Sequence, residues 1–178
     1  MKQRQRQLIW IVSVFFLVLV ADQITKEYII RTIPQGSVTF AGREEQFFFL
    51  THERNTGLVG GAFRDTPAVV YTAPIIATLV LIYLFRHLHP SSVVQAAAYG
   101  MITGGAVGNL VDRFRLGSVT DFIQVHFYFI PFDFPWKRYP AFNIADSAIC
   151  IGVALLIISW HRMERRRQQE SADAPDTS

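Results

Sequence analysis

Four long apolar segments constrain the fold of this chain more than any other feature. Each approaches or exceeds the roughly 20 helical residues that a bilayer's hydrocarbon core requires. They cover residues 8–30, 66–85, 90–111 and 141–160. The second and third contain no charged residue, and the fourth contains only Asp146. The sequence therefore predicts an all-α polytopic membrane protein with four transmembrane helices.

Composition argues against several other classes of protein. Hydrophobic residues make up 51% of the 178 positions, and the chain has 15 Phe, 6 Tyr and 3 Trp. A wholly disordered chain is poor in such residues. The single cysteine, Cys150, rules out a disulfide scaffold. The net charge is +3, but the basic residues flank apolar segments instead of forming a phosphate-binding stripe, so no nucleic-acid partner is expected.

The distribution of Lys and Arg predicts the orientation in the membrane. Basic residues dominate the N-terminal flank, the connection between the second and third segments, and the C-terminal flank: Lys2, Arg4, Arg6, Arg86, Arg162, Arg165, Arg166 and Arg167. The two longer loops, 31–65 and 112–140, are nearly balanced in charge. By the positive-inside rule, both termini are cytoplasmic and these two loops lie outside.

A cleaved secretory signal peptide is the alternative interpretation of the first segment. It has a basic flank, an apolar core and a small residue, Ala21, at its end. A cleavage site also requires a small residue two places earlier, where this chain has Leu19. The sequence thus favours a retained span.

Both outer loops carry strand-like patterns. Residues 38–51 place β-branched and aromatic residues on either side of a turn-like Ala-Gly-Arg, which predicts a hairpin. Residues 118–129 alternate apolar with polar or tyrosine side chains, which predicts a half-buried strand. We expect residues 1–165 to form one membrane domain with a small outer β element. The polar segment 166–178 is expected to be a disordered cytoplasmic tail.

Unusual polar residues gather at one membrane face in this topology. A charged group in the hydrocarbon core costs about 3 kcal/mol on insertion scales, so each is a candidate for function. The predicted outer ends of the apolar segments and the adjoining loops contain Asp22, Asn55, Asn109, Asp112, Arg113, Asp121, Asn143 and Asp146. Their convergence predicts a polar site at the extracytoplasmic surface.

Several of these residues also have a purely structural interpretation. Asp22 and Lys26 are four residues apart on a predicted helix and can neutralise each other. Asp112 and Arg113 can together stabilise the fold. The asparagines at 109 and 143 can act as hydrogen-bonding links between helices.

Acids that lack a counter-ion suggest a reaction. Asp121 and Asp146 have no basic residue at helical spacing, and two such acids can share one proton. One then accepts a proton from water while the other donates to a carbonyl oxygen, which is general acid–base hydrolysis of a peptide bond without a metal or a covalent intermediate. Spacing alone leaves Asp22 and Asp112 as competitors for the two roles. The five histidines are scattered and indicate no metal site.

Glycines in the third segment predict a helix contact. Gly100, Gly104 and Gly108 recur every four residues and therefore share one helix face. A stripe of this kind allows close approach of a neighbouring membrane helix.

Four sequence blocks resemble the lipoprotein signal peptidases (signal peptidase II) of bacteria, and the resemblance covers residues 8–160. The blocks are Asp22-Gln23-Ile24-Thr25-Lys26, Asn55-Thr56-Gly57, GGAVGNLVDRFRLGSVTDFI (104–123) and FNIADSAICIG (142–152). The last two together are highly specific. One departure is present: in the family small residues soon follow Asn-x-Gly, whereas here Leu58 and Val59 precede the small residues.

The resemblance implies an aspartyl endopeptidase that removes the signal peptide from diacylglyceryl-modified prolipoproteins, cleaving just before the lipidated cysteine. It implies that Asp121 and Asp146 are catalytic. The matching supporting positions are Asp22, Asn55, Asn109, Asp112, Arg113 and Asn143.

The resemblance also implies the surroundings of this site. We expect a multi-pass protein of the bacterial cytoplasmic (inner) membrane, with an extracytoplasmic β-cradle and a mobile element over the site. The expected partners are the diacylated prolipoprotein and membrane lipids, and the expected state is a monomer without a cofactor.

Two other functions remain open at this point. A small proton-coupled transporter would place its acids at several membrane depths. A non-catalytic assembly factor would tolerate neutral substitutions at Asp121 and Asp146 together.

Overall fold

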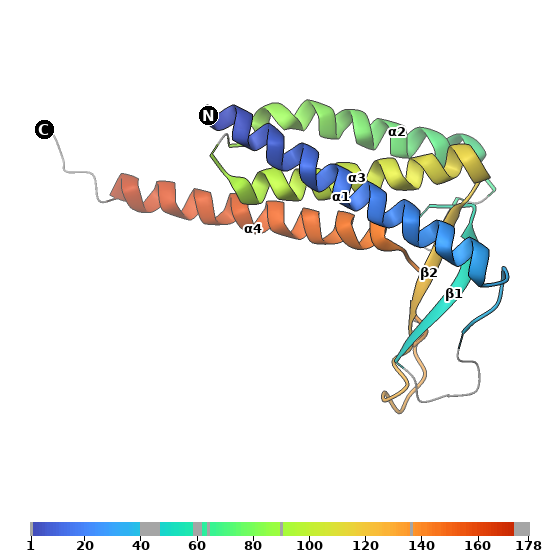
Figure 1. The fold of residues 1–178 in the computed structure, drawn as a ribbon. Coiled ribbons are helices and arrows are strands. Elements are labelled where there is room, and N and C mark those ends of the chain that lie inside the picture. The colour runs from blue at the N-terminus through green and yellow to red at the C-terminus, as the bar shows by residue number, and fades with distance from the viewer. Residues whose placement is uncertain are drawn as a thin grey trace, which may run out of the picture.

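Four helices and a two-stranded sheet make up the described part of the chain. The computed structural model describes residues 2–39, 47–58, 62–63, 65–89, 91–135 and 137–172. Its elements are α1 (Gln3–Thr32), β1 (Phe48–Asn55), α2 (Pro67–Leu84), the 3-10 helix η2 (Phe85–His87), α3 (Val93–Leu116), β2 (Val119–Val125) and α4 (Ile144–Ala172). Helix α3 contacts the other three helices. The sheet projects from one end of the bundle (Figure 1).

The bundle exposes apolar side chains and buries polar ones. Large apolar residues such as Leu17, Ile24 and Ile82 are more than half exposed, whereas Lys26 and Gln95 are buried. A soluble domain has the opposite distribution. By length and composition, α1 and α4 can cross a membrane, and α2 contains a shorter apolar stretch, Ala68–Tyr83. The described helices therefore fit a membrane protein.

The ends of α3 differ from the predicted third segment, 90–111. The helix begins after Ser92, whose side-chain oxygen accepts the N–H of Gln95 at 3.2 Å. It ends at Gly117, whose φ of 71° is left-handed and favours glycine. Asp112 and Arg113 therefore belong to the helix, and the outer loop predicted at 112–140 begins only after Leu116.

The glycine stripe lies at a helix contact, as predicted. A Cβ atom at Gly104 would lie 2.7 Å from the carbonyl oxygen of Phe15 in α1, and one at Gly108 would lie 2.6 Å from the Asp22 carboxylate. On another face of α3, a Cβ at Gly105 would lie 2.5 Å from a carbonyl oxygen of α4. Glycine thus allows α3 to approach both neighbours at once.

The two strands pair antiparallel, with Phe48 opposite Val125 and Asn55 opposite Val119. A bulge between Leu50 and Glu53 adds one residue to β1. The strand predicted at 118–129 ends at Val125. Beyond it the chain turns and pairs with the segment 137–139, as the 2.8 Å bond from the N–H of residue 127 to the carbonyl of residue 137 shows.

The arms of the hairpin predicted at 38–51 are paired. Val38 forms an antiparallel bridge with Thr51, and the N–H of Thr39 donates to the carbonyl of Leu50 at 2.8 Å. The turn expected between the arms, residues 40–46, lies outside the described residues.

Helix α4 continues through residues 166–172, where the sequence analysis expected a disordered tail. This segment is rich in Arg, Gln and Glu, which have high helix propensity. Gln168 also donates to the Glu164 carboxylate one turn earlier, at 3.3 Å. Residues 173–178 lie outside the described part of the chain.

A small apolar cluster fixes the sheet to the bundle. Ile29 and Ile33 of the α1 end pack with Phe122 of β2, and Ile144 at the start of α4 packs against them. This contact places the first half of β2 beside the C-terminal end of α1 and the start of α4.

Candidate active site

All eight site residues predicted from the sequence lie in one connected hydrogen-bond network. They come from five segments of the chain that meet where the sheet joins the bundle (Figure 1). The segments are α1, β1, α3, β2 and the start of α4, which supply Asp22, Asn55, Asn109, Asp112, Arg113, Asp121, Asn143 and Asp146.

A buried lysine is the centre of the inner half of this network. The Nζ atom of Lys26 lies 2.8 Å from an Asp22 oxygen and 3.2 Å from an Asp112 oxygen. It also donates to Oδ1 of Asn109 at 2.9 Å. The side chains of this ion cluster (Asp22, Lys26 and Asp112) are at most 2% exposed. Asp112 thus pairs with Lys26 of α1, and Arg113, which is adjacent to it in sequence, lies toward a different group.

The carboxylates of the ion cluster also hold two neighbouring elements. Oδ1 of Asp22 accepts the N–H of Ala145, in the first turn of α4, at 3.0 Å. Oδ2 of Asp112 accepts the N–H of Thr120 in β2 at 3.1 Å. The ion cluster therefore positions the two elements that carry Asp146 and Asp121.

Asp146 lies in the first turn of α4 and is half-buried. Asn143 precedes the helix, and its Oδ1 accepts the N–H of Asp146 at 2.9 Å, while Oδ2 of Asp146 accepts the N–H of Asn143 at 3.3 Å. This reciprocal pair is a capping box. Oδ1 of Asp146 accepts Nδ2 of Asn109 at 2.7 Å. The carboxylate therefore receives two N–H groups and faces the positive end of the helix dipole.

Asp121 lies in β2 and is 3% exposed. Its Oδ1 accepts Nδ2 of Asn143 at 2.7 Å, and its Oδ2 accepts Nδ2 of Asn55 at 3.1 Å. Burial, followed by the negative charge of Asp146, raises the pKa of the Asp121 carboxyl to about 7. The two asparagine hydrogen bonds act in the opposite direction but do not cancel the rise.

Asn143 links the two aspartates directly. Its side-chain amide donates to Asp121 and its backbone N–H donates to Asp146. Within the described residues, no ion pair includes either aspartate, and no group of three or more His, Cys, Asp or Glu is arranged to hold a metal ion. The two carboxyl groups thus share a neighbour without a paired cation.

Arg113 holds the loop that follows β1. Its Nη2 donates to the carbonyl of Gly57 at 3.0 Å, and its Nη1 donates to the carbonyl of Asn109 at 3.3 Å. Oδ1 of Asn55 accepts the N–H of Gly57 at 3.0 Å, which closes a local turn. Although Leu58 follows this turn where the family has small residues, Asn55 still contacts Asp121.

Two further residues belong to the network. Nε2 of Gln23 donates to Asp112 at 3.0 Å and to the carbonyl of Gly108 at 3.2 Å. The sequence predicts Lys26 only as a partner of Asp22, whereas it also binds Asp112 and Asn109. Both residues lie in the block 22–26, so the resemblance already contained the signal. By contrast, the hydrogen bond from the backbone N–H of Thr120 to Asp112 depends on how β2 folds back onto α3. No pattern in the sequence predicts this bond.

The ion cluster predicts a stability effect. Lys26→Met leaves two buried carboxylates without their cation, and we expect it to lower the free energy of unfolding by about 3–5 kcal/mol. A triple variant, Asp22→Asn, Lys26→Met and Asp112→Asn, should recover part of that loss because the ion cluster then carries no charge. Thermal unfolding in detergent measures both effects.

Lys137→Met is the matched control, because Lys137 pairs with an Asp133 side chain that is 96% exposed. It should shift the unfolding midpoint little. Equal shifts for the Lys26 and Lys137 variants would contradict the role of the ion cluster.

Comparison with known proteins identifies the family. Residues 14–162 match the family signal peptidase (SPase) II. The chain is 36% identical over 156 residues to the lipoprotein signal peptidase of Syntrophotalea carbinolica, covering 85% of this chain and 91% of that protein. It is 41% identical over 159 residues to the lipoprotein signal peptidase of Geobacter sulfurreducens, covering 84% and 89%.

Solved structures agree with this assignment. A bacterial membrane enzyme determined by the in meso method at 2.3 Å resolution aligns with a TM-score of 0.70 and 27% identity, covering 94% of this chain and 93% of that one. A second, determined at 1.9 Å resolution, aligns with a TM-score of 0.68 and 30% identity, covering 84% and 91%. The chain belongs to the signal peptidase II family.

Proposed function

We propose that this signal peptidase II removes the signal peptide from diacylglyceryl-modified prolipoproteins, cleaving just before the lipidated cysteine, with Asp121 and Asp146 as its catalytic pair. The observation that carries the proposal is the link through Asn143 between two carboxyl groups that have no paired cation among the described residues. Asp121 stands in the Val-Thr-Asp-Phe block and Asp146 in Phe-Asn-Ile-Ala-Asp, the positions that the family resemblance assigns to catalysis.

The contacts also distinguish the four competing acids. Asp22 and Asp112 are 0% and 1% exposed and both bind Lys26, so their oxygens serve the fold. Asp121 and Asp146 bind only amide N–H groups among the described residues, and Asp146 is partly exposed. A water molecule can therefore reach Asp146 more readily than Asp22 or Asp112.

The surroundings of the two aspartates support different protonation states. Asp121 is buried and has a pKa raised to about 7, so it holds a proton near neutral pH. Asp146 accepts two N–H groups at the positive end of α4, where a negative charge is stabilised. We therefore assign the role of general acid to Asp121 and that of general base to Asp146.

The reaction follows from these roles. Asp146 accepts a proton from water as the water oxygen bonds to the scissile carbonyl carbon, and Asp121 donates its proton to the carbonyl oxygen. When the C–N bond breaks, Asp146 passes its proton to the leaving amine of the lipidated cysteine. Asp121 recovers its proton as the new carboxyl group forms. The two aspartates end in their starting states.

The supporting residues hold this pair in place. The oxygen of the Asn109 side chain binds Lys26, so its nitrogen must face Asp146. Asn143 positions both aspartates, and Arg113 with Asn55 keeps the 55–57 loop next to Asp121. Such preorganisation reduces the entropy that the reaction must otherwise lose.

The membrane supplies part of the substrate binding. We propose four spanning helices, cytoplasmic termini and a site at the extracytoplasmic face of the bacterial inner membrane. The acyl chains of the substrate then stay in the bilayer, and this remote binding energy helps to place the scissile bond. A monomer suffices, because all eight site residues come from one chain.

A proton-coupled transporter is the second candidate, and the geometry disfavours it. That function predicts acids at several depths, but Asp22, Asp112 and Asp146 belong to a single network at one end of the bundle.

The catalytic pair is tested by Asp121→Asn and Asp146→Asn. Each should lower cleavage of a diacylated prolipoprotein by at least about 10³-fold, because each removes one proton-transfer group. Cleavage is measured by a gel shift in liposomes, with thermal unfolding as the folding check.

Asp133→Asn is the control, since Asp133 is exposed and lies outside the network. It should cleave like the wild type. Cleavage that survives in a folded Asp121 or Asp146 variant would exclude that residue from the catalytic pair. Absence of cleavage by the folded wild type would instead favour the transporter or the assembly factor.

The pH dependence tests the assignment of the proton. Because the acid form of Asp121 is required and its pKa is about 7, kcat/KM should fall as pH rises through 7, approaching about tenfold per pH unit above it. Asn55→Ala removes a hydrogen bond that lowers this pKa, so the falling limb should move to higher pH. A limb that moves to lower pH in Asn55→Ala would refute the assignment.

The topology is tested with reporters. A phosphatase that is active only outside should be inactive when fused after Ser178 and active when fused after Ile130, in the outer loop. A fluorescent protein that matures only in the cytoplasm should give the opposite result. Phosphatase activity of the Ser178 fusion would overturn the proposed orientation.

A further inference from the structure

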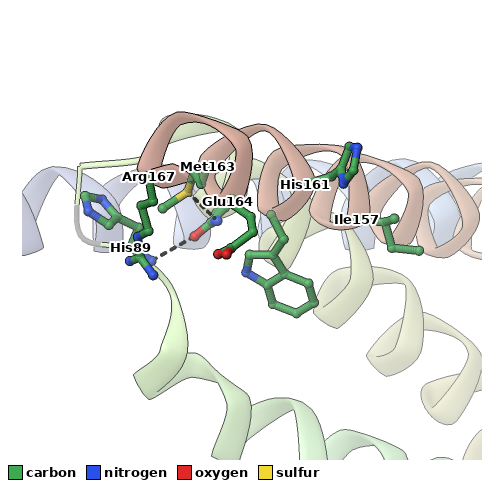
Figure 2. Close-up of a pocket in the computed structure, with 8 residues that line it drawn as sticks. His89, Ile157, His161, Met163, Glu164 and Arg167 are labelled. Atoms are coloured by element: carbon green, nitrogen blue, oxygen red, sulfur yellow. Dashed lines mark hydrogen bonds between the residues drawn. The ribbon is translucent and has the colours of Figure 1, made fainter. Parts of the chain in front are cut away.

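A cavity lies at the end of the bundle opposite the aspartates. Its volume is about 530 Å³, and it lies between the second half of α4, the start of α3 and the connection that precedes α3 (Figure 2). The α4 residues that line it begin at Ile157, eleven residues beyond Asp146, which is about 16 Å along the helix. The cavity is therefore separate from the catalytic network.

The α4 wall of the cavity is an ordered stripe. Ile157, Trp160, Glu164 and Arg167 are spaced by three and four residues and share one helix face. Figure 2 shows Glu164 and Arg167 near one end of the cavity and Ile157 toward the other. From Ile157 to Arg167 the wall changes from apolar to aromatic to charged over about 15 Å.

The opposite wall is a fixed polar structure. Gln95 is 0% exposed, and its Oε1 accepts the N–H of His89 at 2.8 Å. Its Nε2 contacts Sδ of Met163 in α4 at 3.2 Å. These contacts tie the start of α3 and the preceding connection to α4, so the cavity is built by the fold and not by surface side chains alone.

The charges of the lining balance but do not pair. Glu164 supplies one negative charge and Arg167 one positive charge. Among the described residues, no ion pair includes Glu164 or Arg167; the Glu164 carboxylate accepts only the Gln168 amide. Two opposite charges one turn apart therefore face the same cavity unneutralised, which suits a ligand that carries both signs.

We propose that this cavity binds the headgroup of a zwitterionic phospholipid with a primary amine, of the phosphatidylethanolamine type, in the cytoplasmic leaflet. The guanidinium of Arg167 binds the phosphate in the bidentate manner typical of arginine. The carboxylate of Glu164 accepts the ammonium N–H groups, and the indole of Trp160 offers a cation–π contact to the same ammonium. The acyl chains run past Ile157.

A membrane lipid fits better than a soluble amino-phosphate. Ile157 is 58% exposed and continues the cavity along the apolar surface of α4. Trp160 lies between that apolar surface and the basic C-terminal flank. Tryptophan is enriched at membrane–water interfaces, so this position fits the level of the lipid headgroups. The assignment to the cytoplasmic leaflet rests on the proposed topology, in which this end of α4 faces the cytoplasm; it does not depend on the catalytic pair.

Native mass spectrometry of the full chain in detergent provides the test. The protein is titrated with dioleoyl phosphatidylethanolamine, phosphatidylcholine and phosphatidylglycerol. We expect one saturable phosphatidylethanolamine adduct, retained about tenfold more strongly than the other two, because choline has no N–H group and glycerol has no positive charge. Equal retention of the three lipids, or preference for phosphatidylglycerol, would overturn the proposal.

Single substitutions locate the site. Arg167→Gln should weaken phosphatidylethanolamine retention about tenfold, and Glu164→Gln should remove its advantage over phosphatidylcholine. Arg166→Gln and Glu170→Gln are matched controls, because neither residue lines the cavity. Retention unchanged in Arg167→Gln and Glu164→Gln would show that the lipid binds elsewhere.

Two further measurements separate the remaining possibilities. Prolipoprotein cleavage by the Glu164 and Arg167 variants should equal that of the wild type, which verifies folding and separates this site from the aspartates. Soluble glycerophosphoethanolamine should fail to displace the lipid at a hundredfold excess. Displacement would identify a soluble amino-phosphate as the ligand and overturn the lipid assignment.

Discussion

A buried lysine shared by two carboxylates is the interaction on which the site depends. Removing three ions from water costs several kcal/mol for each, and the contacts between them offset this cost only when the remaining polar atoms also have partners. Lys26 meets this condition by binding Asp22, Asp112 and Asn109. The free carboxylate oxygens take N–H groups from the starts of α4 and β2. The groups that stabilise the fold thereby also place both aspartates of the proposed pair.

The ion cluster can form only because α3 lies very close to α1. Gly108 leaves the space that the Asp22 carboxylate occupies, since a Cβ atom there would lie 2.6 Å from its oxygen. Gly104 lets the α1 backbone approach in the same way one turn earlier. Small residues in α3 therefore serve the polar network as much as the packing of the bundle, and any side chain at position 108 would displace a member of the ion cluster.

Local sequence patterns predict the helices, the gathering of eight polar residues at one end of the bundle and the pairing of Asp22 with Lys26, but they do not predict the other partners. Long apolar segments identify the helices because every backbone group must be satisfied within the hydrocarbon. Asp112 and Arg113 are adjacent, yet one contacts Lys26 and the other contacts Gly57, because neighbouring helix positions face different directions. The pairing of Asn55 with Asp121 depends on the register of β1 and β2, which no local pattern encodes. Helical spacing therefore predicts a contact within one helix, as between Asp22 and Lys26, whereas contacts between elements depend on the tertiary structure.

The charges of the whole site favour one shared proton. Four carboxyl groups (Asp22, Asp112, Asp121 and Asp146) face one ammonium, Lys26, and one guanidinium, Arg113, whose charge interacts with Asp146 and Asp121. If all four were ionised, the site would carry two net negative charges next to an apolar bundle; one retained proton leaves a single charge. The strand residue Asp121 is more buried than Asp146, and it is the favoured site for that proton because desolvation is the main cause that raises its pKa. The helix residue, Asp146, is partly exposed to water and accepts two N–H groups at the N-terminus of α4. This difference in environment between a strand and a helix N-terminus is sufficient to divide the two roles of the proposed reaction.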